Sequence, residues 1–336
     1  MEQPSRRQVI SALYAGGGAL LAGCTSGPKE SNDTNETDTT TTGDGETTPS
    51  GTNQSVPDLP EDTTSDACPP FDGTEQVVCY EAVDPEEVPI VLVPDVQTVQ
   101  PDQPSEFTLR NQSEQRFETN FYHWQLYKRV DGDWYYTAPQ FWPEPLTPLE
   151  SGDEHTWTVT IETGRVSDGD DIKRVEGTES LTITGLGGGH YAFGTDGWFA
   201  TSSHKESIAL ASGFELNADP LQLVPTEAVT ETEWDGDTLI ARSTCGEPDG
   251  ETDQRDTYIL ERIDDSTTDA EQIIIEQVVR NEQLRDAIAL SKKHDASQVH
   301  LKEFSRSIPP FRLQDTRTYA FQGDRYRVTA IEGGSS

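Results

Sequence analysis

Basic residues are scarce in this sequence of 336 residues, which has 24 lysines and arginines against 61 aspartates and glutamates. The formal net charge is −37 at pH 7, and lysine is the rarer cation, with 7 copies against 17 arginines. Nucleic-acid binding needs a basic surface that meets the phosphates. The composition therefore argues against nucleic acid as a partner.

A long apolar run is also missing. The charge-free apolar stretch 11–23 has 13 residues and would rise about 20 Å as a helix, whereas a bilayer core needs around 20 residues. Arg6 and Arg7 precede this stretch and Cys24 follows it. A basic segment, a short apolar segment and small residues before a cysteine predict a signal peptide over residues 1–24. The alternative is a buried helix with an unrelated cysteine.

The start of the chain resembles two export patterns. The paired arginines resemble the twin-arginine export signal, and Leu21, Ala22, Gly23 and Cys24 resemble the lipobox that lipoprotein-processing enzymes read. The resemblance implies that Cys24 is the first residue of the mature protein and carries a lipid on its thiol. Because one lipid chain holds a protein weakly, stable anchoring requires a two-chain lipid or a second membrane contact. The expected location is the extracellular face of the cell membrane.

Residues 25–66 predict a disordered stalk. Serine and threonine make up 17 of these 42 residues, and no large apolar residue recurs at any period. Such a segment cannot bury enough apolar surface to offset its ordering entropy, and as a flexible coil it would span roughly 35 Å. Its Asn-x-Ser/Thr triplets, and one further along, are candidate glycosylation sites or chance products of the composition. They begin at Asn32, Asn35, Asn53 and Asn111.

Acidic residues occur in every segment of the chain. Residues 67–336 alone carry a formal charge of about −29, far from the modest charge of an ordinary soluble domain. The carboxylates could form a cation site, or they could coat a protein adapted to high salt, where a Debye length of about 3 Å screens their repulsion. The even spread favours the second explanation. Together with the first 24 residues, it resembles exported lipoproteins of halophilic archaea.

The four cysteines fit an oxidising compartment. With Cys24 lipidated, Cys68 and Cys79 are 11 positions apart and Cys245 is distant. A disulfide that closes the short loop would contribute roughly 3 kcal/mol. We therefore expect Cys68 to pair with Cys79 and Cys245 to be a lone thiol, while pairing of Cys245 with either of the others stays open.

The fold class predicted for the remainder is mainly β, with an immunoglobulin-like β-sandwich over residues 67–220. Runs of strand character separated by turn residues fill this region, at 89–93, 105–111, 120–130, 133–138, 155–161, 180–184, 189–194 and 206–212. The pair at 131–132, Asp-Gly, suits a tight hairpin turn. The proline-rich segment 145–159 and the aromatic strand before it resemble bacterial and archaeal immunoglobulin-like domains. The strand and hairpin residues that carry the resemblance are Trp124, Leu126, Tyr127, Lys128 and Trp134.

Residues 221–336 predict a small α+β domain. Segments 237–243, 256–262 and 271–278 have strand character, and so do 298–303, 317–322 and 325–331. Between the two groups, residues 281–293 place Leu284, Ala287 and Ile288 on one helical face behind a candidate N-cap at Asn281. One helix packed on an antiparallel sheet accommodates both patterns.

The sequence contains no recognisable catalytic, cofactor-binding or metal-ligating motif. The glycine-rich segment from Gly185 leads into a strand-like run from His190, so we expect a turn into a strand rather than a phosphate-binding loop before a helix. The 6 histidines form no His-Glu-x-x-His pair, and no Gly-x-Ser-x-Gly elbow is present. Trp142 lies in a proline-rich loop, where a large ring has less reason to be buried, and we expect it to contact a partner.

These observations predict a noncatalytic surface lipoprotein that presents binding modules to an envelope protein or glycan and uses no cofactor. The alternative is a solute-binding lipoprotein that serves a membrane transporter. Such receptors usually have two α/β lobes, and only one clear helix is visible here. An extracellular hydrolase with dispersed catalytic residues is a third interpretation.

Overall fold

The computed structural model describes residues 56–60, 68–163, 177–246, 254–264, 268–305 and 316–333. All of them belong to one compact unit, Asn53–Ser336. The predicted export signal, Cys24, most of the stalk and its three candidate asparagines lie outside the described residues. Within the described part of the chain, no helix has the length and apolar character that crossing a bilayer requires.

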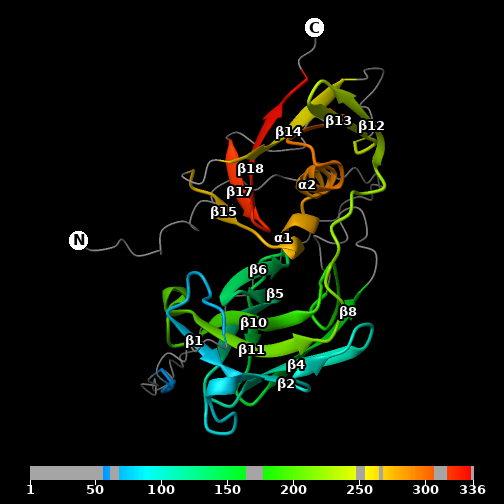
Figure 1. The fold of residues 1–336 in the computed structure, drawn as a ribbon. Helices are drawn as coiled ribbons and strands as arrows, with labels where there is room; N and C mark the ends of the chain where they lie inside the picture. Colours follow the sequence, from blue (N-terminus) through cyan, green and yellow to red (C-terminus); the bar gives the residue numbers. More distant parts are fainter. Residues whose placement is uncertain are drawn as a thin grey trace, which may run out of the picture. The chain divides into compact units, whose positions relative to one another are not determined.

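Two sheets form a sandwich in the first part of this unit (Figure 1). The larger sheet has the strand order β1-β11-β10-β5-β6, with β3 paired to β11 and β7 to β5; the smaller has the order β2-β4-β8-β9. The strands of the larger sheet are β1 (Gln76–Cys79), β3 (Thr98–Val99), β5 (Phe117–Val130), β6 (Asp133–Ala138), β7 (Thr147–Leu149), β10 (Gly189–Phe199) and β11 (Ile208–Leu216). Those of the smaller sheet are β2 (Ile90–Pro94), β4 (Pro104–Asn111), β8 (Glu154–Glu162) and β9 (Ser180–Thr184).

Alternating apolar residues turn one face of each sheet toward a common core. Phe107 of β4 stacks on Phe193 of β10 with ring centroids 4.6 Å apart, and Trp157 of β8 meets the same ring at 5.7 Å. Trp124 of β5 also lies 5.7 Å from Phe193. These rings join the two sheets, and the mainly β prediction is confirmed.

The hairpin between β5 and β6 turns at Asp131 and Gly132, whose φ angles are 52° and 96°. Positive φ at both positions is the geometry that an Asp-Gly pair adopts in a tight hairpin turn, so this prediction is confirmed. The turn fixes the register of the two strands, in which Arg129 pairs with Trp134.

The C-terminal part is one seven-stranded sheet in the order β12-β13-β16-β14-β18-β17-β15 with two helices (Figure 1). Helix α2 (Glu282–His294) packs on β14 and β16. The strands are β12 (Val229–Asp235), β13 (Thr238–Ser243), β14 (Arg255–Ile263), β15 (Glu271–Gln272), β16 (Gln298–Phe304), β17 (Arg317–Phe321) and β18 (Asp324–Ile331), and the shorter helix is α1 (Ile275–Val279). The edge strand β12 had no counterpart in the sequence prediction.

Helix α2 begins where the sequence predicts. The side chain of Asn281 accepts a hydrogen bond from the backbone N–H of Leu284 at 3.0 Å, which is the N-cap arrangement. The helix ends at His294, and the C-cap residue Asp295 has a left-handed φ of 50°. Lys292 and Lys293 lie in the last turn, where positive charge interacts favourably with the helix dipole.

The predicted strand 271–278 is wrong beyond its first two residues. Only Glu271–Gln272 forms a strand, and Ile275–Val279 is the α-helix α1. The run of β-branched residues favours a strand locally. In the structure, Ile274 and Val278 are both buried on one helical turn, and the Gln277 side chain accepts from the backbone N–H of Ile274 at 3.1 Å. Burial and this cap outweigh the local preference.

Candidate functional site

A row of five side chains crosses the larger sandwich sheet on the face opposite the core. Strand pairing aligns Thr98 with Glu215 and Glu215 with His190. The pairing of the neighbouring residues brings His190 beside Arg129, which pairs with Trp134. The row borders a hollow of about 370 Å³. Residues from five strands, spread between positions 98 and 215 of the chain, therefore meet at one place.

The β5–β6 hairpin supplies the basic and aromatic groups of this hollow. The Arg129 guanidinium lies 6.0 Å from the centroid of the Trp134 ring, within the range of a cation–π contact. His190 and Glu215 of the neighbouring strands are exposed. The hollow thus offers a guanidinium, an imidazole, a carboxylate and an indole on rigid strands.

Glu81 closes one side of the hollow. It lies in a short 3₁₀ turn directly after β1, and its Oε1 accepts a hydrogen bond from the backbone N–H of Gly213 at 2.8 Å. Although the residue as a whole is exposed, desolvation of the carboxyl group raises the pKa of Glu81, and this hydrogen bond only partly opposes the shift. The site therefore holds two carboxylates with different surroundings, Glu81 and Glu215.

The segment that carries Glu81 is tied down by a disulfide between Cys68 and Cys79, whose Cα atoms are 5.9 Å apart. Within the closed loop, Phe71 packs edge-on against Tyr127, with ring centroids 5.2 Å apart. A Cβ on Gly194 would collide with the Phe71 ring, so only glycine admits this close approach. The disulfide loop thus covers part of the sheet and leaves the hollow beside it open.

Within the described residues, one group of cysteine, histidine and acidic side chains is close enough to share a metal ion. It consists of Cys68, Cys79 and Glu81. Both sulfur atoms belong to the disulfide, so neither is a thiolate that could bind a metal. Cys245 carries a free, half-buried thiol, and burial raises its pKa.

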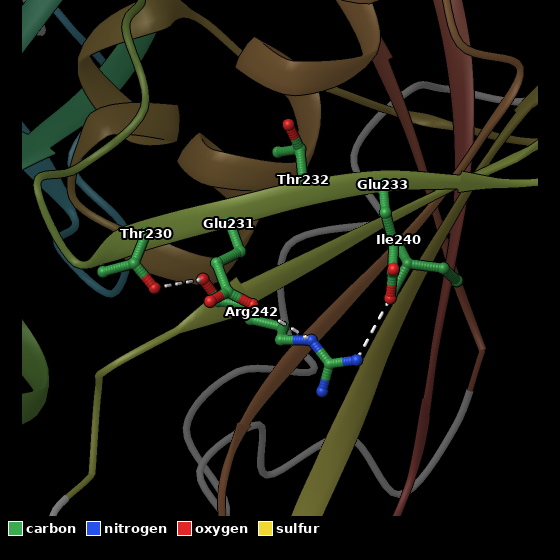
Figure 2. A pocket seen from close by; sticks show the side chains of 6 residues that line it. All are labelled: Thr230, Glu231, Thr232, Glu233, Ile240 and Arg242. Atoms are coloured by element: carbon green, nitrogen blue, oxygen red, sulfur yellow. Dashed lines mark hydrogen bonds and ion pairs between the residues drawn. The ribbon is translucent and has the colours of Figure 1, made fainter.

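A second hollow, of about 400 Å³, lies on the C-terminal sheet at β12 and β13. Figure 2 shows Arg242 pointing toward two glutamates of the edge strand. Its Nη2 lies 3.0 Å from Glu233, and its Nε lies 3.5 Å from Glu231. These charges already form exposed ion pairs, an arrangement that contributes little to stability and leaves fewer groups for a ligand.

Trp142, expected to contact a partner, is half-buried. Its ring stacks on His123 with centroids 4.4 Å apart, and Nδ1 of His123 lies 3.1 Å from Asp196. In the same loop Phe141 and Leu146 are each 58% exposed. The more accessible apolar groups of this loop are therefore its phenylalanine and leucine, which the sequence did not single out.

Asn111, the one candidate glycosylation site among the described residues, is 1% exposed. Its Nδ2 donates to the backbone oxygens of Gln115 at 2.7 Å and Leu149 at 3.0 Å. A glycan is attached through this nitrogen, so modification of the folded protein would require these bonds to break.

The glycine-rich segment leads directly into β10, which begins at Gly189. The predicted turn into a strand is confirmed. A Cβ on Gly188 would collide with the backbone of Ala218, and one on Gly187 with that of Leu221. These glycines allow the chain to pack closely against the segment that connects the sandwich to the C-terminal sheet.

No protein-family model matches the chain, and a search of curated proteins finds no match. Among solved structures, the chain is similar to the sporulation control protein Spo0M from Bacillus subtilis, with 12% identity and a TM-score of 0.23. The match covers 38% of this chain and 49% of that chain. A likeness at this TM-score carries no argument about function.

Proposed function

We propose that the protein is a noncatalytic lipoprotein, anchored to the outer face of the cell membrane through Cys24, that binds envelope glycans in the hollow on its sandwich. The export pattern and the stalk support the location. The observation that carries the binding role is the row of charged and aromatic groups on the larger sheet.

The composition of the hollow suits a sugar. Trp134 offers an aromatic surface for the apolar face of a sugar ring. Around it, Arg129, His190 and Glu215 offer donors and acceptors to hydroxyl groups. Because these side chains are carried by paired strands, the backbone needs little ordering on binding.

Binding is tested on the mature chain in molar salt with a panel of neutral and uronic-acid oligosaccharides, by saturation-transfer NMR and calorimetry. We expect Trp134→Ala and His190→Ala to weaken binding at least about tenfold, the loss of roughly 1.4 kcal/mol. Trp234→Ala is the matched control, because Trp234 is 52% exposed on β12 and does not line the hollow.

If all these variants bind equally well, the hollow is not the binding site. If no oligosaccharide of the panel binds, the ligand is not a glycan. A small solute that co-purifies with the protein in native mass spectrometry would favour a solute-binding lipoprotein instead. An envelope protein captured only by variants with an intact hollow would replace glycan by protein as the partner.

The anchor is tested separately. Cys24→Ser should release the protein from the membrane fraction or leave it unprocessed, and Arg6-Arg7→Lys-Lys should keep it inside the cell. Both are measured by cell fractionation and by the mass of the mature protein. A Cys24→Ser protein that is normally processed and fully membrane-bound would contradict the lipobox interpretation.

A further inference from the structure

A buried polar cluster joins the sandwich to the C-terminal part. Glu276 of α1 is 1% exposed, and its Oε1 accepts from three groups of the sandwich. The Lys128 Nζ lies at 2.5 Å, the backbone N–H of Gly187 at 3.2 Å and the Tyr191 hydroxyl at 3.3 Å. One carboxylate oxygen therefore takes part in every one of these contacts.

Arg280, at the end of α1, is likewise 1% exposed. Its Nη1 donates to the backbone oxygens of Gly185 at 3.0 Å and Glu276 at 2.7 Å, and its Nη2 donates to the oxygen of Thr184 at 2.8 Å. Burial lowers its pKa to about 10, which still leaves the guanidinium charged at neutral pH. The arginine thus connects α1 to the end of β9 in the smaller sheet.

Three polar atoms of these hydrogen-bonded residues are buried and have no hydrogen-bond partner among the described residues: Glu276 Oε2, Arg280 Nε and Thr184 Oγ1. An unmet buried polar group costs about 1–3 kcal/mol, and more when it is charged. Three of them in one small cluster would be a large cost unless one further molecule satisfies them together.

The chemistry of the three atoms restricts what that molecule is. It has to donate to a carboxylate oxygen and accept from a guanidinium N–H at once, and the threonine hydroxyl can do either. A metal cation cannot accept from the Arg280 Nε–H, and a halide cannot donate to Glu276 Oε2, so either would leave one of these atoms without a partner. A water molecule both donates and accepts, and buried waters usually make about three hydrogen bonds.

We infer that one ordered water molecule is bound at this junction, where it bridges Glu276 Oε2, Arg280 Nε and Thr184 Oγ1. Through it, Glu276 of α1 is tied to the side chain of Thr184, the last residue of β9, in addition to the direct bond from Arg280 to the Thr184 oxygen. The site selects water even in molar salt, because neither a metal cation nor a halide can both donate to Glu276 Oε2 and accept from the Arg280 Nε–H.

The first measurement is made on the intact chain labelled with ¹⁵N-arginine. The Nε–H signal of Arg280 is assigned by its loss in Arg280→Lys. It should show a nuclear Overhauser cross-peak to water in both the laboratory frame and the rotating frame. The signs of these two cross-peaks should be those of a bound water rather than those of proton exchange. The cross-peak should persist in Thr184→Val, because two partners still hold the water. Its absence from the wild-type protein, or its loss in Thr184→Val, would overturn the inference.

The second measurement uses the sign of a stability change. If the Thr184 hydroxyl bonds a water, Thr184→Val should lower the Tm by about 2 to 4 °C, the shift of losing one hydrogen bond in a domain of this size. If the hydroxyl has no partner, the same substitution removes an unmet polar group and should raise the Tm. Thr182→Val, at an exposed position of the same strand, is the matched control for strand preference.

Discussion

The sandwich and the C-terminal sheet bury their strands in different ways. In the sandwich, large rings fill the space between two sheets, and Trp124, Trp157 and Phe193 are each at most 1% exposed. Under α2, most buried side chains are aliphatic, and the one tryptophan of that region, Trp234, is 52% exposed. Facing sheets stand about 10 Å apart, a distance that rings span, whereas a helix brings side chains of its own. The size of the side chains on the buried face of a sheet therefore indicates whether a second sheet or a helix packs on it.

The two regions also differ in charge. Residues 67–220 contain 27 acidic and 8 basic residues, a formal charge of −19, and residues 221–336 contain 23 and 13, a formal charge of −10. The C-terminal region uses some of its charges internally. Asp286 is fully buried, and both of its carboxylate oxygens accept hydrogen bonds from Thr226. The backbone N–H of Thr226 donates to one oxygen at 2.6 Å, and the Thr226 hydroxyl donates to the other at 2.8 Å. The sandwich should therefore depend more on rings and on salt.

The largest effect is expected in the ring core. Trp157→Ala should cost about 3–5 kcal/mol of unfolding free energy, because it leaves a cavity against Phe193 that the sheets cannot close. Denaturant titrations in molar salt measure it. Trp234→Ala is the control and should stay within about 0.5 kcal/mol. A loss below about 1 kcal/mol in Trp157→Ala would contradict the ring-filled core.

The next effect concerns the junction of the two regions. Glu276→Ala leaves the buried ammonium of Lys128 without its carboxylate, and breaking such a pair costs about 3 kcal/mol or more. We expect the single unfolding transition to separate into two, seen as different midpoints for tryptophan fluorescence and far-ultraviolet circular dichroism. Lys292→Ala, which removes an exposed ion pair with Asp324, should leave one transition. Coincident midpoints in Glu276→Ala would show that the regions cooperate without this pair.

Local patterns in the sequence predict most of this fold. Alternation indicates the long strands, Asn281 marks the start of α2, and the short spacing favours the disulfide between Cys68 and Cys79. Strand β12 was missed and helix α1 was predicted as a strand, for different reasons. Strand β12 has exposed side chains from Thr230 to Asp235, so it shows no alternation of buried and exposed residues, and α1 has a strand-like composition.

The hollow and the junction could not be predicted from such patterns. Thr98 and Glu215 lie 117 positions apart but are paired in parallel strands. Lys128 and Glu276 are 148 positions apart and lie in different regions. Each residue looks like an ordinary surface group in its own segment. Only the register of five strands and the docking of α1 bring them together.

Salt should affect the two regions unequally. Lowering salt from molar to about 0.01 M lengthens the Debye length from about 3 Å to about 30 Å, so repulsion acts across a whole domain. We expect the Tm to fall steeply, and amides of the sandwich to lose protection in hydrogen exchange before those of the C-terminal sheet. Mild acidification should partly restore both. A Tm independent of salt would contradict the interpretation that the acidic surface is an adaptation to high salt. It would favour carboxylates that are locally paired or that bind cations.

A smaller effect is expected at the start of α2. Asn281→Ala removes the acceptor for the backbone N–H of Leu284 and should cost about 1 kcal/mol. Asn281→Asp keeps an acceptor and should cost less. The Glu276→Ala background makes the test specific, because the loss should then appear only in the transition of the C-terminal region. A loss in the sandwich transition would mean that the two regions remain coupled.

The smallest effect comes from single carboxyl groups, one in each region. Desolvation raises the pKa of Glu81 in the sandwich, and it also raises the pKa of Glu271 in the C-terminal sheet, where Arg317 opposes the shift. A raised pKa means that the folded state holds the proton more tightly than the unfolded state does. The stability that this provides is present below the unfolded value of about 4.3 and is lost as the pH rises through the folded value.

Glu81→Gln removes this loss of stability, so the unfolding free energy of the variant should rise relative to the wild-type protein as the pH rises above about 4.3. The amide oxygen can still accept from Gly213, so the variant changes charge and little else. Because Glu81 is exposed, solvent screening keeps the effect small. Glu271→Gln should change stability in the same direction, since desolvation is the larger influence there too. Denaturant titrations at four pH values measure both, and parallel profiles for variant and wild type would contradict a raised pKa.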